Sequence, residues 1–113
     1  MFEEFLGDLD ADSSRAVAMI IDHVAALVPE AEEGRSYGLA AFIWHDKPLL
    51  GFNATATHLS LYPFSPAAVD AVRPQLEGFR LSKGTLRFTP DRPVPLDAVT
   101  TLVQRRMEEI AGD

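Results

Sequence analysis

The chain has 113 residues, of which 47% are hydrophobic and 24% are charged, and its formal net charge is −7. This composition predicts one globular domain, residues 1–113, whose core is large enough to fold without disulfides or metals. Because the sequence contains no cysteine, thiol catalysis, disulfide exchange and cysteine-ligated zinc or iron–sulfur clusters are excluded.

The beginning of the chain does not have the pattern of a secretory signal. Residues 1–14 carry acids where a signal would carry basic residues followed by an apolar run, and no stretch of the sequence reaches membrane-spanning length. We therefore expect a cytoplasmic protein without a membrane partner.

Charge is uneven along the chain. Residues 1–34 contain nine acids and one base, which gives −8, whereas residues 73–92 contain five bases and two acids, which gives +3. Because a net-negative surface repels nucleic acids, we expect no nucleic-acid partner.

Two helices are expected at the start of the chain. Apolar residues at helical spacing predict a short helix at residues 2–6. A longer apolar stripe predicts a second helix from about Ser14 to Val28, capped by the oxygen-bearing side chains before it and ended by Pro29. The acidic residues 29–36 are expected to form a connector.

From residue 38 onward the pattern changes to β-branched, aromatic and glycine-punctuated runs. These runs predict strands at residues 38–44, 48–53 and 56–62, joined as an antiparallel meander.

The last third of the chain mixes helix and strand. A helix is expected after the N-cap Ser65, with an interruption at Pro74. A strand at residues 84–88, an extended segment and an amphipathic helix at residues 96–110 follow. Helices at both ends and strands between them predict an α+β fold, in which helices pack on one face of a central antiparallel sheet.

The N-terminal carboxylates are one candidate site. Hard oxygen ligands of this kind bind Fe(II), Mn(II), Mg(II) or Ca(II) loosely at a surface, which would suit a metal carrier. The alternative is a solubilising face whose charge favours a helix N-terminus, and on the residues alone this alternative is the better explanation. The candidate metal ligands are Glu3, Glu4, Asp8, Asp10, Asp12 and Asp22.

The segment "LSKGTLRF" (81–88) is part of a second candidate site. It lacks the length and the first glycine of a P-loop, although Lys83 and Gly84 could form a backbone nest for one phosphate or carboxylate, helped by Arg80 and Arg87. We favour the alternative, a turn in which Gly84 supplies a positive φ and Lys83 is solvated. A polar groove on the sheet is the wider hypothesis, and its candidate ligand-binding residues are Tyr37, His58, Tyr62, Lys83 and Arg87.

The sequence does not predict an enzyme. The three histidines do not form a metal-binding pair at helical or strand spacing, and no serine lies in a nucleophile elbow. His58 shares a predicted strand face with Ser60 and Tyr62, where a half-exposed histidine without a ligand is the commoner situation.

Five blocks of the sequence resemble, in order and spacing, the YdhG-like domain-of-unknown-function family, which is grouped with YjbR and with CyaY, the bacterial frataxin. The blocks are "VPEAEEGRSYGLAAF" (28–42), "KPLLGF" (47–52), "THLSLYP" (57–63), "LEGFRLSKGTLRF" (76–88) and "PVPLDAVTTLVQRR" (93–106). Ala40 stands where the family usually has a proline, which leaves the local turn or bulge open.

The resemblance implies a compact two-layer α+β sandwich similar to frataxin. Some members of the family carry the label iron chaperone. For this chain, that label implies weakly bound iron, no tightly bound cofactor, and iron–sulfur or haem assembly proteins as partners.

Two functions from different classes remain open. The first is a non-enzymatic iron-binding chaperone that uses the N-terminal acids. The second is a binding module for a small anionic ligand or a protein partner, which uses the polar groove on the sheet. A monomer or weak homodimer is expected in either case.

Overall fold

The computed structural model describes residues 2–112, which form four α-helices, one 3-10 helix and one six-stranded antiparallel sheet. The strand order in the sheet is β1-β2-β3-β4-β6-β5. No helix in this part of the chain is long and apolar enough to cross a membrane. The elements are α1 (Phe2–Gly7), α2 (Ala11–Leu27), β1 (Glu32–Ser36), β2 (Leu39–Trp44), β3 (Lys47–Ala54), β4 (Leu59–Tyr62), α3 (Pro66–Val72), η1 (Arg73–Gln75), β5 (Arg80–Ser82), β6 (Thr85–Phe88) and α4 (Leu96–Gly112).

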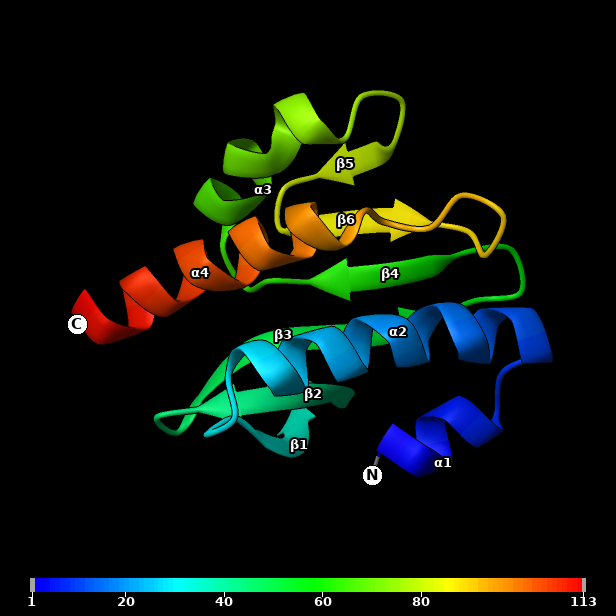
Figure 1. Cartoon of the computed structure of the whole chain (residues 1–113), viewed down its shortest axis with the longest axis horizontal. Coiled ribbons are helices and arrows are strands. Elements are labelled where there is room, and N and C mark those ends of the chain that lie inside the picture. The colour runs from blue at the N-terminus through cyan, green and yellow to red at the C-terminus, as the bar shows by residue number, and fades with distance from the viewer. Residues whose placement is uncertain (1, 113) are drawn as a thin grey trace.

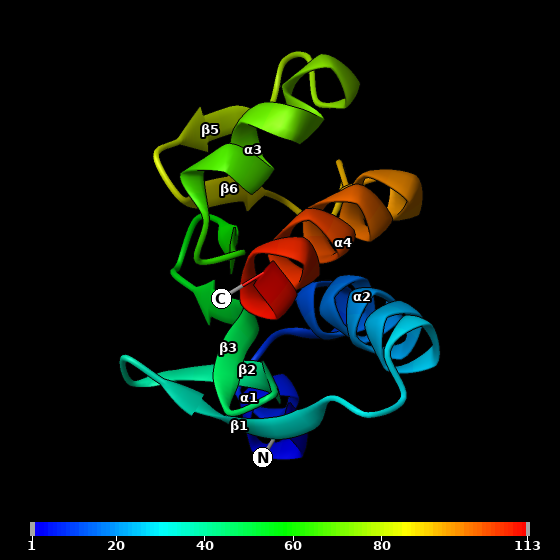
Figure 2. The same ribbon diagram turned by 90° about the vertical axis from the view of Figure 1, so that its left-hand side faces the viewer.

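The molecule has two layers, as the sequence predicts. Helices α2 and α4 lie side by side across the sheet (Figure 1), and Figure 2 shows them on the same side of the strands. A single apolar cluster between the layers joins residues of all four α-helices to the strands. Within residues 2–112, no helix covers the opposite face of the sheet, which we call the open face.

The helix ends follow from their capping residues. Asp10 accepts the N–H of Ser13 at 2.8 Å, so α2 begins at Ala11, three residues before the predicted start. Ser65 caps α3 as predicted, by accepting the N–H of Ala68 at 3.0 Å. The predicted interruption near Pro74 is also confirmed, because the α-helix passes into the 3-10 helix η1 there.

The prediction of a connector is wrong for residues 32–36, which form the edge strand β1. This strand pairs with β2 over its whole length, from Glu32 opposite Ile43 to Ser36 opposite Leu39. The acidic composition of the segment does not have the apolar pattern by which strands are predicted. Charged side chains are common on edge strands, where one side of the backbone has no neighbouring strand.

The backbone is regular at Ala40, the position where the YdhG-like family usually has a proline. Ala40 is buried in β2 and lies opposite both Arg35 and Phe52. The irregularity of this sheet falls instead between Phe42 and Ile43, opposite Pro48 of β3, where a proline cannot donate a ladder hydrogen bond.

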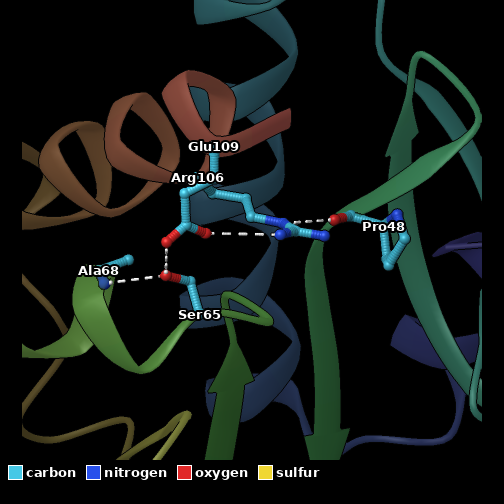
Figure 3. A network of polar contacts seen from close by, with 5 residues as sticks. All are labelled: Pro48, Ser65, Ala68, Arg106 and Glu109. Carbon is cyan, nitrogen blue, oxygen red and sulfur yellow. Dashed lines mark hydrogen bonds and ion pairs between the residues drawn. The ribbon is translucent and has the colours of Figure 1, made fainter. Parts of the chain in front are cut away.

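A network of polar contacts ties α4 to α3 and to the start of β3 (Figure 3). Arg106 donates from Nε to the carbonyl of Pro48 at 2.9 Å, and its NH1 atom lies 3.4 Å from Glu109 Oε1. The other carboxylate oxygen of Glu109 accepts the hydroxyl of Ser65 at 2.7 Å. The network therefore holds three elements together at the end of the sheet where α4 finishes.

Candidate functional site

Polar side chains of the open face alternate with residues of the core. In β6, Leu86 and Phe88 are buried, so Arg87 between them points to the open face. The strand register places Ser60 of β4 opposite Arg87 on one side and Arg80 of β5 opposite it on the other. Directly opposed residues share a face, so these three side chains form one row across the sheet.

A cavity of about 430 Å³ includes the two arginines of this row. Its volume lies in the range of small-molecule binding sites. Strands β5 and β6 supply part of the wall, and the turns before β4, before β5 and after β6 supply the rest. The residues that line it are Thr57, His58, Gly78, Phe79, Arg80, Arg87, Phe88, Thr89 and Arg92.

Arg92 is a fixed part of the cavity wall. Its NH1 and NH2 atoms donate to the carbonyls of Gly78 at 3.2 Å and Glu77 at 3.0 Å. Its guanidinium carbon lies 4.6 Å from the centre of the Phe79 ring, over the ring face. The turn that carries it is closed by a hydrogen bond of 3.0 Å from its own N–H to the carbonyl of Thr89.

The charge of the cavity is positive and uncompensated. Of the residues that the structure describes, none of those lining the cavity is acidic. Asp91, although next to Arg92, lines a separate surface hollow with Asp10 and Asp12.

The other arginines of the chain are mostly paired, in contrast to those of the cavity. Ion pairs of 3.0–3.4 Å join Arg15, Arg73, Arg105 and Arg106 to carboxylates three residues away. Between residues 2 and 112, no carboxylate forms such a pair with the three arginines of the cavity. Because Arg80 and Arg87 lie directly opposite each other, their like charges repel. An anion bound between them would relieve this repulsion.

His58 is held at the cavity by two threonines. Its Nδ1 atom lies 3.1 Å from the hydroxyl of Thr55 and 3.2 Å from the hydroxyl of Thr57. A hydroxyl that donates to Nδ1 leaves the proton of the neutral ring on Nε2, where it can serve as a donor. The Thr55 hydroxyl also accepts the N–H groups of residues 57 and 58, and this local turn is the reason that β4 begins at Leu59 rather than at residue 56.

The structure brings together two of the five predicted ligand-binding residues. His58 and Arg87 line the same cavity. Lys83 lies in the turn between β5 and β6, beside Gly84 with a φ of +84°, as expected for a turn. Neither Lys83 nor Tyr62 is among the described residues that line the cavity.

Tyr37 belongs to a different part of the open face. It is 87% exposed and stacks on Phe64, with the ring centres 6.1 Å apart. Phe64 in turn covers Gly51 of β3, which lies opposite Tyr62 of β4. The groove predicted from sequence is therefore divided into an aromatic pair near β2 and β3 and the cationic cavity near β5 and β6.

Arg80 and Arg92 are the cavity arginines that are not among the five predicted ligand-binding residues, although Arg80 is expected from the sequence to help an anion nest at Lys83 and Gly84. The signal for them was present in the charge count, since both fall in the segment of residues 73–92 with a net charge of +3. Their convergence depends on the pairing of β5 with β6 and on the turn after β6, neither of which the sequence pattern specifies.

The predicted metal ligands occupy α1, α2 and the connection between them. Glu3 and Glu4 are exposed on α1, Asp10 caps α2, and Asp12 pairs with Arg15. Asp8 and Asp22 are also exposed. Within residues 2–112, no group of three or more histidine or acidic side chains is placed to hold a metal ion. The loose iron-binding surface therefore stays a prediction, while the role of Asp10 in capping a helix is seen directly.

Asp10 is expected to make stability depend on pH. The hydrogen bond from the N–H of Ser13 lowers the pKa of Asp10 below its ordinary value. Because the folded-state pKa is the lower one, the stabilisation is present above the unfolded pKa of about 3.9 and is lost as the pH falls through the folded value. Asp10→Asn keeps a capping oxygen but cannot ionise, so its stability deficit relative to wild type should be larger at pH 7 than at pH 3 in urea unfolding. Equal deficits at the two pH values would contradict this.

Gly78 leaves room for the guanidinium group of Arg92, because it has no Cβ atom. Its φ is +87°, and a Cβ atom there would lie 2.7 Å from the NH2 atom of Arg92. Gly84 has nearly the same φ, +84°, but no atom lies within 4 Å of its Cβ position. Both substitutions to alanine carry a backbone cost of about 1 kcal/mol. Gly78→Ala should cost about 1 kcal/mol more, because it also displaces a charged hydrogen-bonded side chain. Chemical denaturation of the two variants measures the difference, and equal losses would show that Gly78 does not support Arg92.

No family model matches the chain, and no curated protein matches it in sequence. Among solved structures, the chain is similar to the crystal structure of a protein of the DUF1801 family, YdhG, from Bacillus subtilis. The TM-score is 0.86 at 16% sequence identity, and the match covers 97% of this chain and 90% of that chain. The chain therefore has the fold of a DUF1801 protein, in line with its YdhG-like sequence blocks, while its grouping with frataxin stays a prediction.

Proposed function

We propose that this protein is a cytoplasmic binding module that holds a small anionic ligand in the cationic cavity on the open face of its sheet. The observation that carries the proposal is the convergence of Arg80, Arg87 and Arg92 on one cavity without an acidic lining residue among those described. In a protein with a net charge of −7, this concentration of positive charge runs against the overall balance.

The arginines differ in how much of their hydrogen-bonding capacity is used. Arg92 already donates to two carbonyls. The side chains of Arg80 and Arg87 have no hydrogen-bond acceptor among residues 2–112. Guanidinium groups form strong, paired hydrogen bonds with carboxylates and phosphates, so these two side chains are ready to receive an anion.

Iron delivery has less support than anion binding. The acids of α1 and α2 form no set of three potential metal ligands within the described residues. An anaerobic Fe(II) titration followed by NMR would test this role, since shifts in the signals of the first 35 residues are its expected result.

Thermal unfolding in the presence of citrate and pyrophosphate, with sodium chloride at matched ionic strength as reference, tests the proposed function. A ligand that binds only the folded state raises Tm in a saturable way. We expect this rise for the wild type and its loss in Arg80→Gln/Arg87→Gln. Without ligand, the double variant should be as stable as the wild type or slightly more so, because the repulsion between the opposed arginines is removed.

The matched control is Arg73→Gln/Lys83→Gln, which removes two positive charges from the same segment but no residue that lines the cavity. We expect this control to respond to both anions like the wild type. A wild-type protein that shows no rise, or two double variants that lose it equally, would contradict binding in the cavity.

A further inference from the structure

We infer that the anion is an organic phosphate monoester whose organic group is flat and apolar. This inference rests on the proposed function and assigns the chemical class of its ligand. It rests on two different parts of the cavity wall. One part consists of charged side chains, and the other consists of side chains with flat surfaces.

The charged part of the wall is formed by Arg80 and Arg87. They lie opposite each other on adjacent strands and on the same face, so both guanidinium groups can reach one anion. A phosphate monoester has up to two negative charges and three terminal oxygens near neutral pH, whereas a carboxylate has one charge and two oxygens. Two opposed guanidinium groups are therefore better matched by the phosphate.

The flat part of the wall is formed by Arg92 and Phe79. The guanidinium of Arg92 rests on the Phe79 ring, and two of its N–H groups are already engaged by the carbonyls of Glu77 and Gly78. What Arg92 adds to the cavity is a fixed planar surface, on which aromatic groups stack well.

The cavity has room for more than an inorganic phosphate. A volume of about 430 Å³ is several times that of a single phosphate group and is sufficient for a small organic molecule. The apolar surfaces would stay unused if phosphate alone were bound. A ligand that joins a phosphate to a flat ring would use both parts of the wall.

Three probes separate these contributions in an NMR titration of the isotope-labelled full chain: phenyl phosphate, benzoate and inorganic phosphate. All three should shift the amide signals of residues 78–80, 87–89, 91 and 92. Phenyl phosphate should bind about tenfold more tightly than each of the other two, because only it combines a dianion with a ring. Arg80→Gln and Arg87→Gln should each weaken phenyl phosphate about tenfold, and Lys83→Gln should leave it unchanged.

Arg92→Lys tests the flat wall, since lysine keeps the charge and removes the planar group. This variant should reduce the advantage of phenyl phosphate over inorganic phosphate and leave the affinity for inorganic phosphate within a factor of about two. Its unfolding curve must show a folded protein, and Arg92→Gln, which keeps a planar amide, should retain more of the advantage.

The outcomes distinguish the two levels of the proposal. If benzoate binds as tightly as phenyl phosphate at the same amides, the anion site stands and the phosphate assignment is wrong. If inorganic phosphate binds as tightly as phenyl phosphate, the role of the flat wall is wrong. If no probe shifts these amides, both the ligand class and the proposed function fail.

A phosphate monoester can be a free metabolite or part of a phosphorylated protein. A short peptide that contains phosphotyrosine distinguishes these sources when compared with phenyl phosphate. Affinity equal to or below that of phenyl phosphate assigns the site to a free small molecule. Tighter binding, with added shifts at Tyr37 and Phe64 on the rest of the open face, assigns it to a phosphorylated segment of a partner.

Discussion

Replacing Phe52 by alanine should lower the free energy of unfolding by about 3–5 kcal/mol, the largest loss that we expect from any single substitution considered for this chain. Phe52 is 1% exposed at the centre of the apolar cluster. Its ring lies 5.5 Å from that of Phe2, 6.4 Å from that of Phe5 and 6.2 Å from that of Phe42, measured between ring centres. Alanine would remove contacts with α1 and β2 together and leave a cavity that the sheet cannot close.

Urea unfolding at equilibrium measures this loss. The control is Met19→Ala on α2, where the methionine is 55% exposed and alanine is a good helix former. We expect that variant to remain within about 0.5 kcal/mol of wild type. A loss below about 1.5 kcal/mol for Phe52→Ala would mean that α1 is not packed on the sheet as described.

Replacing Arg106 by alanine should lower the free energy of unfolding by about 2–3 kcal/mol. Only 15% of its side chain is exposed, and it binds the carbonyl of Pro48 as well as Glu109. The substitution removes a charged donor from a partly buried acceptor and takes away one partner of the carboxylate that holds the Ser65 hydroxyl. The loss should therefore exceed that of an ordinary surface ion pair.

The preceding residue supplies the control for Arg106. Arg105 also pairs with a glutamate three residues on, at 3.1 Å from Glu108, but 49% of its side chain is exposed. Arg105→Ala should cost less than about 0.5 kcal/mol. A double-mutant cycle between Ser65→Ala and Arg106→Ala, both linked through Glu109, should give a coupling energy above about 0.5 kcal/mol. Additive losses would show that the contacts of Figure 3 do not act as one network.

The layered fold could be predicted because its signals are local. The apolar spacing of α2 and α4, the apolar runs of β2 and β3 and the alternation around β4 each depend on a few adjacent residues. The strands β1 and β5 could not be predicted in the same way. β1 is a charged edge strand, and β5 has only three residues, so both depend on pairing with a neighbour rather than on their own composition.

The difference between local patterns and long-range pairing also explains which residues of the candidate site could be predicted from the sequence. Arg87 could be assigned to a polar face from its place between Leu86 and Phe88, a local alternation. Arg80 reaches the cavity because β5 pairs with β6 in one register, and Arg92 reaches it because a turn folds back onto Gly78. Lys83, four residues from Arg87 in sequence, is carried to the hairpin turn by that register.

The contacts of Arg106 and Glu109 also bear on the order in which the chain can complete its fold. They join residues that are 58 and 44 positions apart in sequence. Pairing among β1, β2 and β3 closes only short loops, so it can precede the docking of α4. During synthesis, the contacts that join α4 to α3 and to the start of β3 therefore form only after residues 106–109 have been made. Until then, the part of the apolar core that α4 covers is exposed to chaperones and to other nascent chains.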